Sequence, residues 1–597
     1  MRRQIVTACA LSALSLSAAD GGYVPTRAFA ADPSESGSNA GVERRIPGEA
    51  EPKRVPPPDV DPGQVPPPRV VEDETFEWTV PVPDRWRLIE TLGVHERWWD
   101  PYNQNTLKGD RPLFDDWFVN LLLISDTTLE PRSLPTPTQA SGTGNAGTLD
   151  FFADNDQLVF NQNLLTSVSF IKGDTAYKPP DYEIRLTPII NYNYVEAEQA
   201  GFLQIDPQDG TTRSDGNVHL QEAFFDKHLR NVSDRYDFDS LRLGIQPITA
   251  DFRGFLFQDE QFGARLFGTR DNNKWQYNAA WFHRLEKDTN SGLNDLKFRD
   301  DDVFLFNLYR QDIPVKGYTV QGVVAHNRNR DTEFHYNENG FLERPQSIGL
   351  ERPREYDVTY LGFNGDGHFG RFNLSHSFYY AFGDNSANQF TSFFEDEPAD
   401  IESFFVAVEP SIDFSWLRLR GSFLYASGDD DPFDDTETGF DAIFENPRFA
   451  GADTSYWIRQ PVPLIGGGGA VLSGRNGVLN SLRSSKEEGQ ANFANPGIRL
   501  LGAGFDMDLT PEFRLSGNLN HLSFDETAVL EQLRMQPLSS REIGWDVSLA
   551  AIWRPLFTQN VVARLSGAAL FPEDGFRELF PDQDVHYSVL FNLVLTY

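Results

Sequence analysis

Arginine recurs at alternate positions within several apolar stretches of this 597-residue sequence. Arg418 and Arg420, for example, alternate with Leu417 and Leu419. Because neighbouring side chains of a strand point to opposite faces, such a stretch has one charged face and one apolar face. An arginine facing lipid at mid-membrane would cost roughly 2–4 kcal/mol, so we expect these arginines to line an interior. The residues expected there are Arg185, Arg242, Arg265, Arg371, Arg418, Arg420, Arg514 and Arg564, together with Glu409, Asp413, Asp506 and Asp546.

Inward arginines have two interpretations, and the sequence leaves both open. A continuous row would lower the electrostatic barrier for anions that pass along the interior. Alternatively, the arginines pair with the inward aspartates and glutamates in a network that belongs to the wall.

The densest acidic run spans residues 428–437. Its carboxylates Asp429, Asp431, Asp434 and Asp435 are the kind of ligand that Ca²⁺ prefers, and they could share divalent ions with lipopolysaccharide phosphates. The run lacks glycine where an EF-hand loop needs it, which favours a plain solvated loop. No other cofactor is expected.

Nucleophilic catalysis is not expected. Ser375, His376 and Ser377 lie together, but on a strand the histidine points away from both serines, so base and nucleophile are separated. The single cysteine, Cys9, lies in an N-terminal apolar stretch, so the mature chain has neither disulfide nor thiol nucleophile. The sequence therefore predicts a protein that is not an enzyme.

The elements that position these residues are predicted to be antiparallel strands. From Trp117 to the end, stretches of about 9 to 14 residues alternate apolar and polar side chains. We count about 18 of them, an even number, as single-chain bacterial barrels have. The predicted strands are 117–126, 158–171, 183–195, 218–229, 239–248, 262–270, 274–286, 302–312, 317–328, 356–364, 370–382, 402–414, 416–427, 497–509, 512–524, 541–555, 560–571 and 585–597.

The predicted links alternate between short and long. Tight links such as 415–416 and 510–512 follow even-numbered strands, whereas long links such as 329–355 and 428–496 follow odd-numbered ones. Transmembrane barrels have short periplasmic turns and long outer loops in this order. The pattern predicts an all-β transmembrane barrel over residues 116–597, with both ends periplasmic and the chain in the outer membrane.

Composition excludes two other classes of protein. The chain has 52 Lys and Arg against 88 Asp and Glu, a formal charge of -36, which argues against nucleic acid as a partner. After the first 20 residues no apolar run approaches the roughly 20 residues that a transmembrane helix needs. Aromatic residues make up 13% and could form belts on the lipid side, for which the candidates are Tyr192, Tyr194, Trp275, Tyr277, Trp281, Trp545 and Trp553.

Three segments precede the barrel. Residues 1–30 read as a secretory signal peptide, with two arginines before an apolar stretch. Residues 31–75 are rich in proline and predict a disordered periplasmic segment. Residues 76–115 are rich in tryptophan and are expected at the periplasmic rim or as a plug in the lumen.

Three stretches carry a resemblance to known proteins. The last strand, HYSVLFNLVLTY at 586–597, resembles the C-terminal signal of bacterial outer-membrane barrels, which ends in an aromatic residue. WWDPYNQNTLKGDRP at 98–112 and SLRLGIQPITADFRGFLFQDEQFGARLFG at 240–268 look like a recurring family of outer-membrane proteins. The layout is similar to porins, in the broad company of anion-selective and alginate-exporting channels. The resemblance implies passage of a solute without saying which one.

Together these features predict a channel for small hydrophilic solutes, anionic ones if the arginines form a track, with loop 428–496 folded inward. Its partners would be outer-membrane lipid and lipopolysaccharide. The alternative is a barrel that sheaths or anchors a transenvelope complex, such as an electron conduit. Such a scaffold would bind a periplasmic partner through residues 31–115.

Overall fold

The computed structural model describes most of the barrel region and little of what precedes it. The predicted signal peptide, the proline-rich segment and half of residues 76–115 lie outside the described residues. The described residues are 93, 95–102, 105–137, 152–153, 155–173, 179–233, 235, 237–345, 352–388, 390, 398–464, 475–479, 482, 485–555, 559–580 and 585–597.

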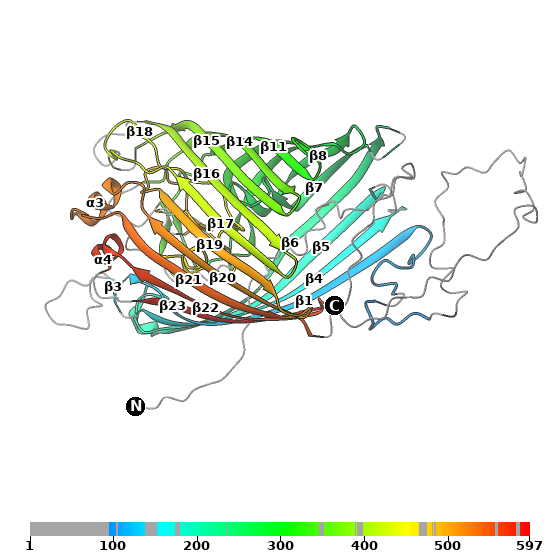
Figure 1. Ribbon diagram of the computed structural model, residues 1–597, viewed down its shortest axis with the longest axis horizontal. Helices are drawn as coiled ribbons and strands as arrows, with labels where there is room; N and C mark the ends of the chain where they lie inside the picture. Colours follow the sequence, from blue (N-terminus) through cyan, green and yellow to red (C-terminus); the bar gives the residue numbers. More distant parts are fainter. Residues whose placement is uncertain are drawn as a thin grey trace, which may run out of the picture. The chain divides into compact units, whose positions relative to one another are not determined.

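The described chain forms a closed antiparallel β-barrel of 18 strands, as the sequence predicted (Figure 1). Each strand pairs with its neighbours in the chain, and β1 closes the ring against β23, with Ile124 opposite Thr596. The strands are β1 (Trp117–Ser133), β4 (Asp156–Lys172), β5 (Tyr182–Ala197), β6 (Thr212–Asn231), β7 (Phe238–Thr249), β8 (Gln258–Arg270), β9 (Trp275–Lys287), β10 (Asn294–Gln311), β11 (Tyr318–Asn329), β14 (Tyr356–Phe369), β15 (Phe372–Asn385), β16 (Ala399–Phe414), β17 (Leu417–Ala426), β19 (Ile498–Asp508), β20 (Phe513–Ser523), β21 (Glu542–Trp553), β22 (Val561–Pro572) and β23 (His586–Thr596).

Side chains along each strand alternate between the outside and the inside of the ring. In β16, Phe404 is 43% exposed whereas the next residue, Phe405, is completely buried. Trp275, Trp281, Trp545 and Trp553 are exposed large side chains of the same outer surface. A closed ring pairs nearly all of its strand edges, and an apolar outer surface suits lipid. The fold is therefore a transmembrane barrel.

The two ends of the barrel differ in their connections. At one end, the turn end, the links are short: β16 and β17 are joined by residues 415–416, and β14 and β15 by residues 370–371. At the other end, the loop end, the links are mostly longer, and residues 427–497 form the longest. The C-terminus lies at the turn end, and helices α3 (Ala528–Arg534) and α4 (Asp574–Leu579) lie at the loop end (Figure 1).

Short elements occupy the loop-end links. They are β2 (Thr136–Pro137), β3 (Phe152–Ala153), β12 (His335–Tyr336), β13 (Leu342–Arg344), β18 (Thr436–Glu437), the 3-10 helix η2 (Pro207–Asp209) and helix α2 (Tyr456–Arg459). No helix among the described residues is both long and apolar enough to cross a membrane.

The segment before the barrel covers a seam at the turn end. Strand β1 is longer than its partner β23 there, since their pairing begins only at Ile124. The Leu121 N–H donates to the Leu107 carbonyl at 2.7 Å, so residues 105–109 lie along the free edge of β1. The Asn105 amide donates to the Tyr597 hydroxyl at 2.8 Å. This segment thereby shields a strand edge that would otherwise be open to pairing with another chain.

Candidate functional site in the barrel lumen

The short link between β7 and β8 folds into the barrel lumen instead of extending outward from the loop end. This short inward loop, residues 250–257, joins β7 to β8. The buried carboxylate of Asp251 accepts backbone N–H groups from residues 253–256 at 2.6–3.2 Å. A carboxylate that collects successive amides fixes the course of a turn. Asp251 therefore organises the short inward loop.

The barrel wall holds this loop through further hydrogen bonds. The Tyr379 hydroxyl, on β15, donates to Asp251 at 2.8 Å. The Ala250 carbonyl accepts the side-chain amides of Asn307, on β10, and Gln321, on β11, at 3.1 and 2.6 Å. Three wall strands thus fix the loop in place.

The longest link also folds inward and pairs with the first. We call its described residues between 427 and 497 the long inward loop. Its Phe444 exchanges backbone hydrogen bonds with the short loop and the start of β8: its N–H donates to Leu256 at 3.1 Å, and its carbonyl accepts from Gln258 at 2.9 Å. The Asn446 N–H donates to Gly254 at 2.9 Å. The two inward loops therefore form one backbone-linked unit.

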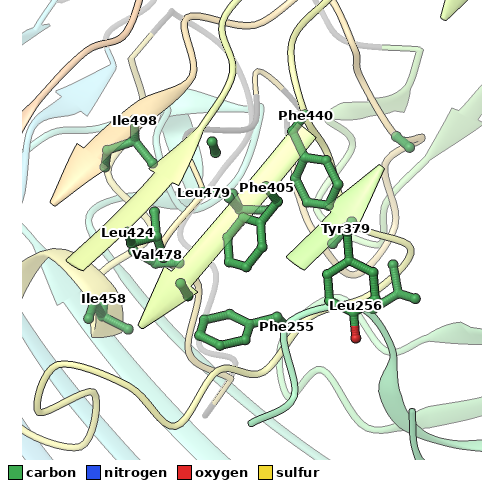
Figure 2. Packing of buried hydrophobic residues seen from close by; sticks show 14 of the residues in the cluster. Phe255, Leu256, Tyr379, Phe405, Leu424, Phe440, Ile458, Val478, Leu479 and Ile498 are labelled. Atoms are coloured by element: carbon green, nitrogen blue, oxygen red, sulfur yellow. The ribbon is translucent and has the colours of Figure 1, made fainter. Parts of the chain in front are cut away.

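Apolar side chains fill the space between these loops and the wall (Figure 2). The Phe405 ring of β16 lies 4.9 Å from Phe255 of the short loop and 5.2 Å from Phe440 of the long loop, between centroids. All of these side chains are almost fully buried. We call this cluster, with Tyr379 and Leu424, the lumen core; it occupies part of an interior that a barrel of this size would otherwise leave to water.

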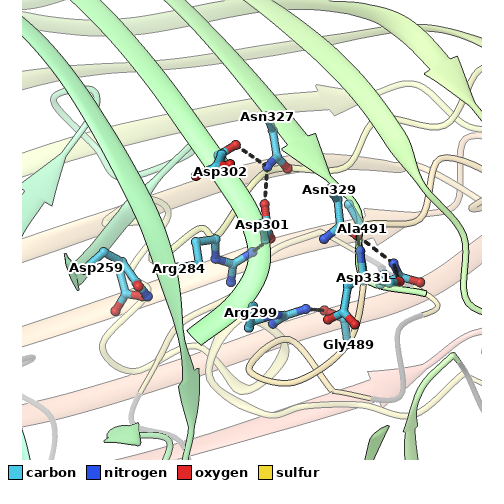
Figure 3. A network of polar contacts seen from close by, with 12 residues as sticks. Asp259, Arg284, Arg299, Asp301, Asp302, Asn327, Asn329, Asp331, Gly489 and Ala491 are labelled. Atoms are coloured by element: carbon cyan, nitrogen blue, oxygen red, sulfur yellow. Dashed lines mark hydrogen bonds and ion pairs between the residues drawn. The ribbon is translucent and has the colours of Figure 1, made fainter. Parts of the chain in front are cut away.

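A network of charged and polar side chains joins the wall strands β9–β11 to the long inward loop (Figure 3). Arg299 of β10 is buried and donates to the carbonyls of Glu487 and Gly489 in the long loop, at 3.1 and 2.9 Å. Arg284 of β9 pairs with Asp301 of β10 at 2.8 Å. The wall therefore provides the donors that this part of the loop backbone needs inside the barrel.

A second buried group joins the wall to the long inward loop. Lys287 of β9 lies 2.7 Å from Asp259 of β8, and the Arg475 guanidinium approaches the same carboxylate at 3.0 Å. Lys287 and Asp259 are both buried. One carboxylate thus pairs with two cations from two parts of the chain.

Most predicted lumen arginines are paired. Arg242 lies 2.9 Å from Asp226, and Arg185 lies 2.7 Å from Glu183. The other pairs are Arg418 with Asp413, Arg420 with Asp506, Arg514 with Asp508, and Arg564 with Asp453. Arg265 donates to Asn278, and Arg371 lies exposed in the turn between β14 and β15. This arrangement agrees with the wall network rather than with a row of unpaired arginines.

Two predicted acidic residues hold the long inward loop. Glu409 accepts the Ala450 N–H at 3.0 Å and lies 3.3 Å from Arg253 of the short loop. Asp546 accepts the backbone N–H groups of Tyr456 and Trp457 at 3.0 and 3.2 Å, where helix α2 begins. Both carboxylates face the lumen, and both are covered by loop residues.

The inner wall changes character along β16–β20. Near the turn end the inward pair Arg418 and Asp413 is 48% and 38% exposed. Toward the loop end the inward residues are Leu424 and Leu500, both buried under the long loop. The turn-end half of this inner wall is therefore exposed to water, and the loop-end half is buried under the long inward loop.

The predicted acidic run does not form one cluster. Asp429 is buried, whereas Asp431, Asp434 and Asp435 are exposed. Burial, followed by the charges of Glu437 and Asp434, raises the pKa of Asp429 to about 7. Calcium binding by the run stays a prediction. Among the described residues, carboxylates and histidines gather with metal-ligand spacing at two other places, His521–Glu542–Glu573 and Asp215–Asp288–Glu338.

Glu409 and Asp546 were singled out from the sequence, but the other residues that anchor the loops were not. Asp251, Asp259 and Lys287 lie in or beside stretches read only as strands and links. A signal was present in Gly254-Phe255-Leu256-Phe257, where three consecutive apolar residues break the alternation expected of a wall strand. Such a run needs cover on every side, which a solvated loop cannot give.

No family model and no curated protein matches this chain. Among solved structures it is similar to a BenF-like porin from Pseudomonas fluorescens, at 9% identity over 80% of this chain and 99% of that one, with a TM-score of 0.44. It is similar to Pseudomonas aeruginosa OccK9 at 11% identity over 82% and 100%, with a TM-score of 0.43, and to Acinetobacter baumannii OccAB1 at 8% over 81% and 98%, also at 0.43. The closed ring of strands establishes the architecture independently of these similarities. The chain is a transmembrane β-barrel of 18 strands. In this barrel, the inward loops and the charged wall that they contact are the candidate functional site.

Proposed function

We propose that this chain is an outer-membrane channel through which small hydrophilic solutes diffuse past the two inward loops. The observation that carries the proposal is the inner wall of β16–β20. Its inward charges are exposed to water at the turn end, while the outward neighbours on the same strands are apolar. The half-exposed ion pair of Arg418 and Asp413 indicates that water reaches this part of the lumen, as a channel requires.

The loops set the size of solute that can pass. The lumen core is held by the wall through Asp251, Glu409 and Asp546, so it does not depend on a bound partner for its position. Solutes would pass beside the lumen core along the polar wall. The turn end would face the periplasm, as the predicted export route requires.

The paired arginines support weak charge selectivity. Each arginine next to a carboxylate contributes a dipole instead of a net charge, so the attraction for anions is reduced. We therefore expect both anions and cations to pass, with only a modest preference for anions.

Liposome swelling tests this proposal. The refolded mature chain in liposomes should admit pentoses and small amino acids and exclude trisaccharides. Liposomes that contain the chain should swell no faster than empty ones if the proposal is wrong.

A scaffold is the second candidate, and one observation favours it. Trp98 and Tyr102, in the segment beside the C-terminus, are each 69% exposed. Exposed aromatic residues in a preformed segment suit contact with another protein. Deleting residues 31–75 and measuring both conductance and recovery of periplasmic partners separates the candidates, because unchanged conductance with a lost partner would favour the scaffold.

A further inference from the structure

Three metal-ligand side chains meet at the loop end, on the outer face of the barrel. The His521 Nε2 lies 3.0 Å from an oxygen of Glu573 and 3.5 Å from an oxygen of Glu542. One ligand atom from each of the three residues lies within 4.8 Å of the others. These separations are close to those between ligands of one divalent ion, because metal–ligand bonds of about 2.0–2.2 Å place ligand atoms about 3 Å apart.

The three residues come from three different segments. His521 is near the end of β20, Glu542 begins β21, and Glu573 follows β22. The Glu573 N–H donates to the Ile543 carbonyl at 2.9 Å, which fixes the backbone of the third segment against β21. The His521 ring lies 4.7 Å from the Trp545 ring, centroid to centroid, so its orientation is also restrained. The group is therefore positioned before any ligand arrives.

Apart from His521 itself, no cationic side chain among the described residues pairs with the two glutamates of this group. Nearby cations are engaged elsewhere: Arg541 pairs with Glu526 at 2.6 Å, and Arg499 pairs with Asp525. The His521 Nε2 and Glu573 share a hydrogen bond at 3.0 Å, so a divalent ion would replace the shared proton and be bound by one imidazole nitrogen and two carboxylates.

We propose that His521, Glu542 and Glu573 bind one divalent first-row transition metal ion, of which zinc is the representative. Imidazole is a good ligand for such ions and a poor one for calcium or magnesium. All three side chains are partly exposed, so water completes the coordination. The ion would tie β20, β21 and the link that carries α4 together at the rim.

Metal titration tests the site directly. The untagged full mature chain, refolded and stripped with a chelator, is titrated with Zn²⁺ against a chromophoric chelator, and with Co²⁺ while the visible absorption is recorded. The wild-type chain should bind one more zinc ion than His521→Gln, and the visible cobalt bands should be lost in that variant. Glu573→Gln and Glu542→Gln should each weaken zinc at this site at least tenfold.

A matched control separates this site from general histidine binding. His326 is another partly exposed histidine near one carboxylate, Asp357, at 3.6 Å, but Arg330 already pairs with that carboxylate. His326→Gln should keep the wild-type stoichiometry. Folding of every variant is checked by its mobility on unheated gels, and Glu542→Gln serves if His521→Gln fails to fold. Equal zinc stoichiometry in wild type, His521→Gln and Glu542→Gln would overturn the proposal.

Discussion

The hydroxyl of Tyr379 donates to the carboxylate of Asp251 at 2.8 Å, across the space between the wall strand β15 and the short inward loop. Asp251 uses the rest of its lone pairs on the backbone of its own loop. The contact therefore joins the element that narrows the lumen to the element that encloses it.

Tyr379→Phe should loosen the short inward loop. A hydrogen bond to a charged group contributes about 1.5–3 kcal/mol, so loop opening should become roughly ten- to hundredfold more frequent. Single-channel recordings should show more frequent excursions to higher conductance. Tyr318→Phe is the control, because its hydroxyl bonds His376 on the outer face and should leave the recordings unchanged.

Gly254→Ala should disrupt the pairing of the two inward loops. Gly254 has a φ of +75°, and an added Cβ would lie 2.6 Å from the Asn446 carbonyl oxygen that neighbours the pairing. We expect faster amide exchange at Asn446 and at Phe444. Gly322→Ala is the matched control, since a Cβ there meets nothing within 4 Å. Equal exchange in both variants would contradict the proposed pairing.

The long inward loop should be less stable at high pH. Burial, with the charges of Glu437 and Asp434, raises the pKa of Asp429 to about 7, from about 3.9 in an unfolded chain. A carboxyl with a raised pKa contributes its full stability below about pH 4 and loses it as the pH rises through 7. Protection of the Asp429 amide, which donates to Asn495 at 2.8 Å, should fall at least tenfold between pH 5 and pH 8.

Asp429→Asn should remove most of that pH dependence, because the amide cannot ionise. Asp435→Asn is the control, since Asp435 is exposed in the same run. If amide protection in the Asp429→Asn variant falls with pH as steeply as in the wild type, another group controls the pH dependence of the loop.

The Asp259 carboxylate should contribute more to the stability of the folded barrel than the Lys287 ammonium does. Removing one partner of a buried ion pair costs about 3–5 kcal/mol. Asp259→Asn leaves both Lys287 and Arg475 without their carboxylate, whereas Lys287→Met leaves Asp259 with Arg475. Denaturant unfolding in lipid should rank Asp259→Asn as the less stable variant. Lys297→Met, in an exposed pair with Asp295, should change stability by less than about 1 kcal/mol.

Combined Arg→Ala changes at Arg242, Arg265 and Arg418 should shift the reversal potential toward cations. The change leaves Asp226 and Asp413 without their arginines, so the wall gains net negative charge. Recordings in a salt gradient measure the shift. Arg541→Ala, at the loop-end rim, is the control. Unchanged selectivity in the triple variant would show that these arginines do not face the path of the ions.

Alternation made the barrel predictable, because lipid on one side and water or protein on the other impose a period of two on every strand. Arg242 and Arg418 could be assigned to the inner face for the same reason. The sequence also predicted that loop 428–496 folds inward, but the contacts that hold it there join distant segments of the chain and were not predicted. The nearest signal lies in pairs such as Phe404-Phe405 and Leu500-Leu501, where both faces of a strand are apolar. In a barrel, such a pair indicates that something covers the inner face.

The anchors of the inward loops could not be read from the sequence because their roles depend on geometry. Asp251 stands in an ordinary polar setting along the chain, and only the fold brings the Tyr379 hydroxyl to it. Glu409 was assigned to the lumen, but its contact with the Ala450 N–H required knowing where the long loop goes.

Single-channel recording of the refolded mature chain beside a loop-shortened variant tests the central claim most directly. The variant replaces residues 430–495 with a short glycine-serine link, and a control shortens the β5–β6 link by removing residues 204–210. The account predicts discrete channels in the wild type, a several-fold larger conductance in the variant, and wild-type conductance in the control. The absence of channels in both the wild type and the loop-shortened variant would contradict it.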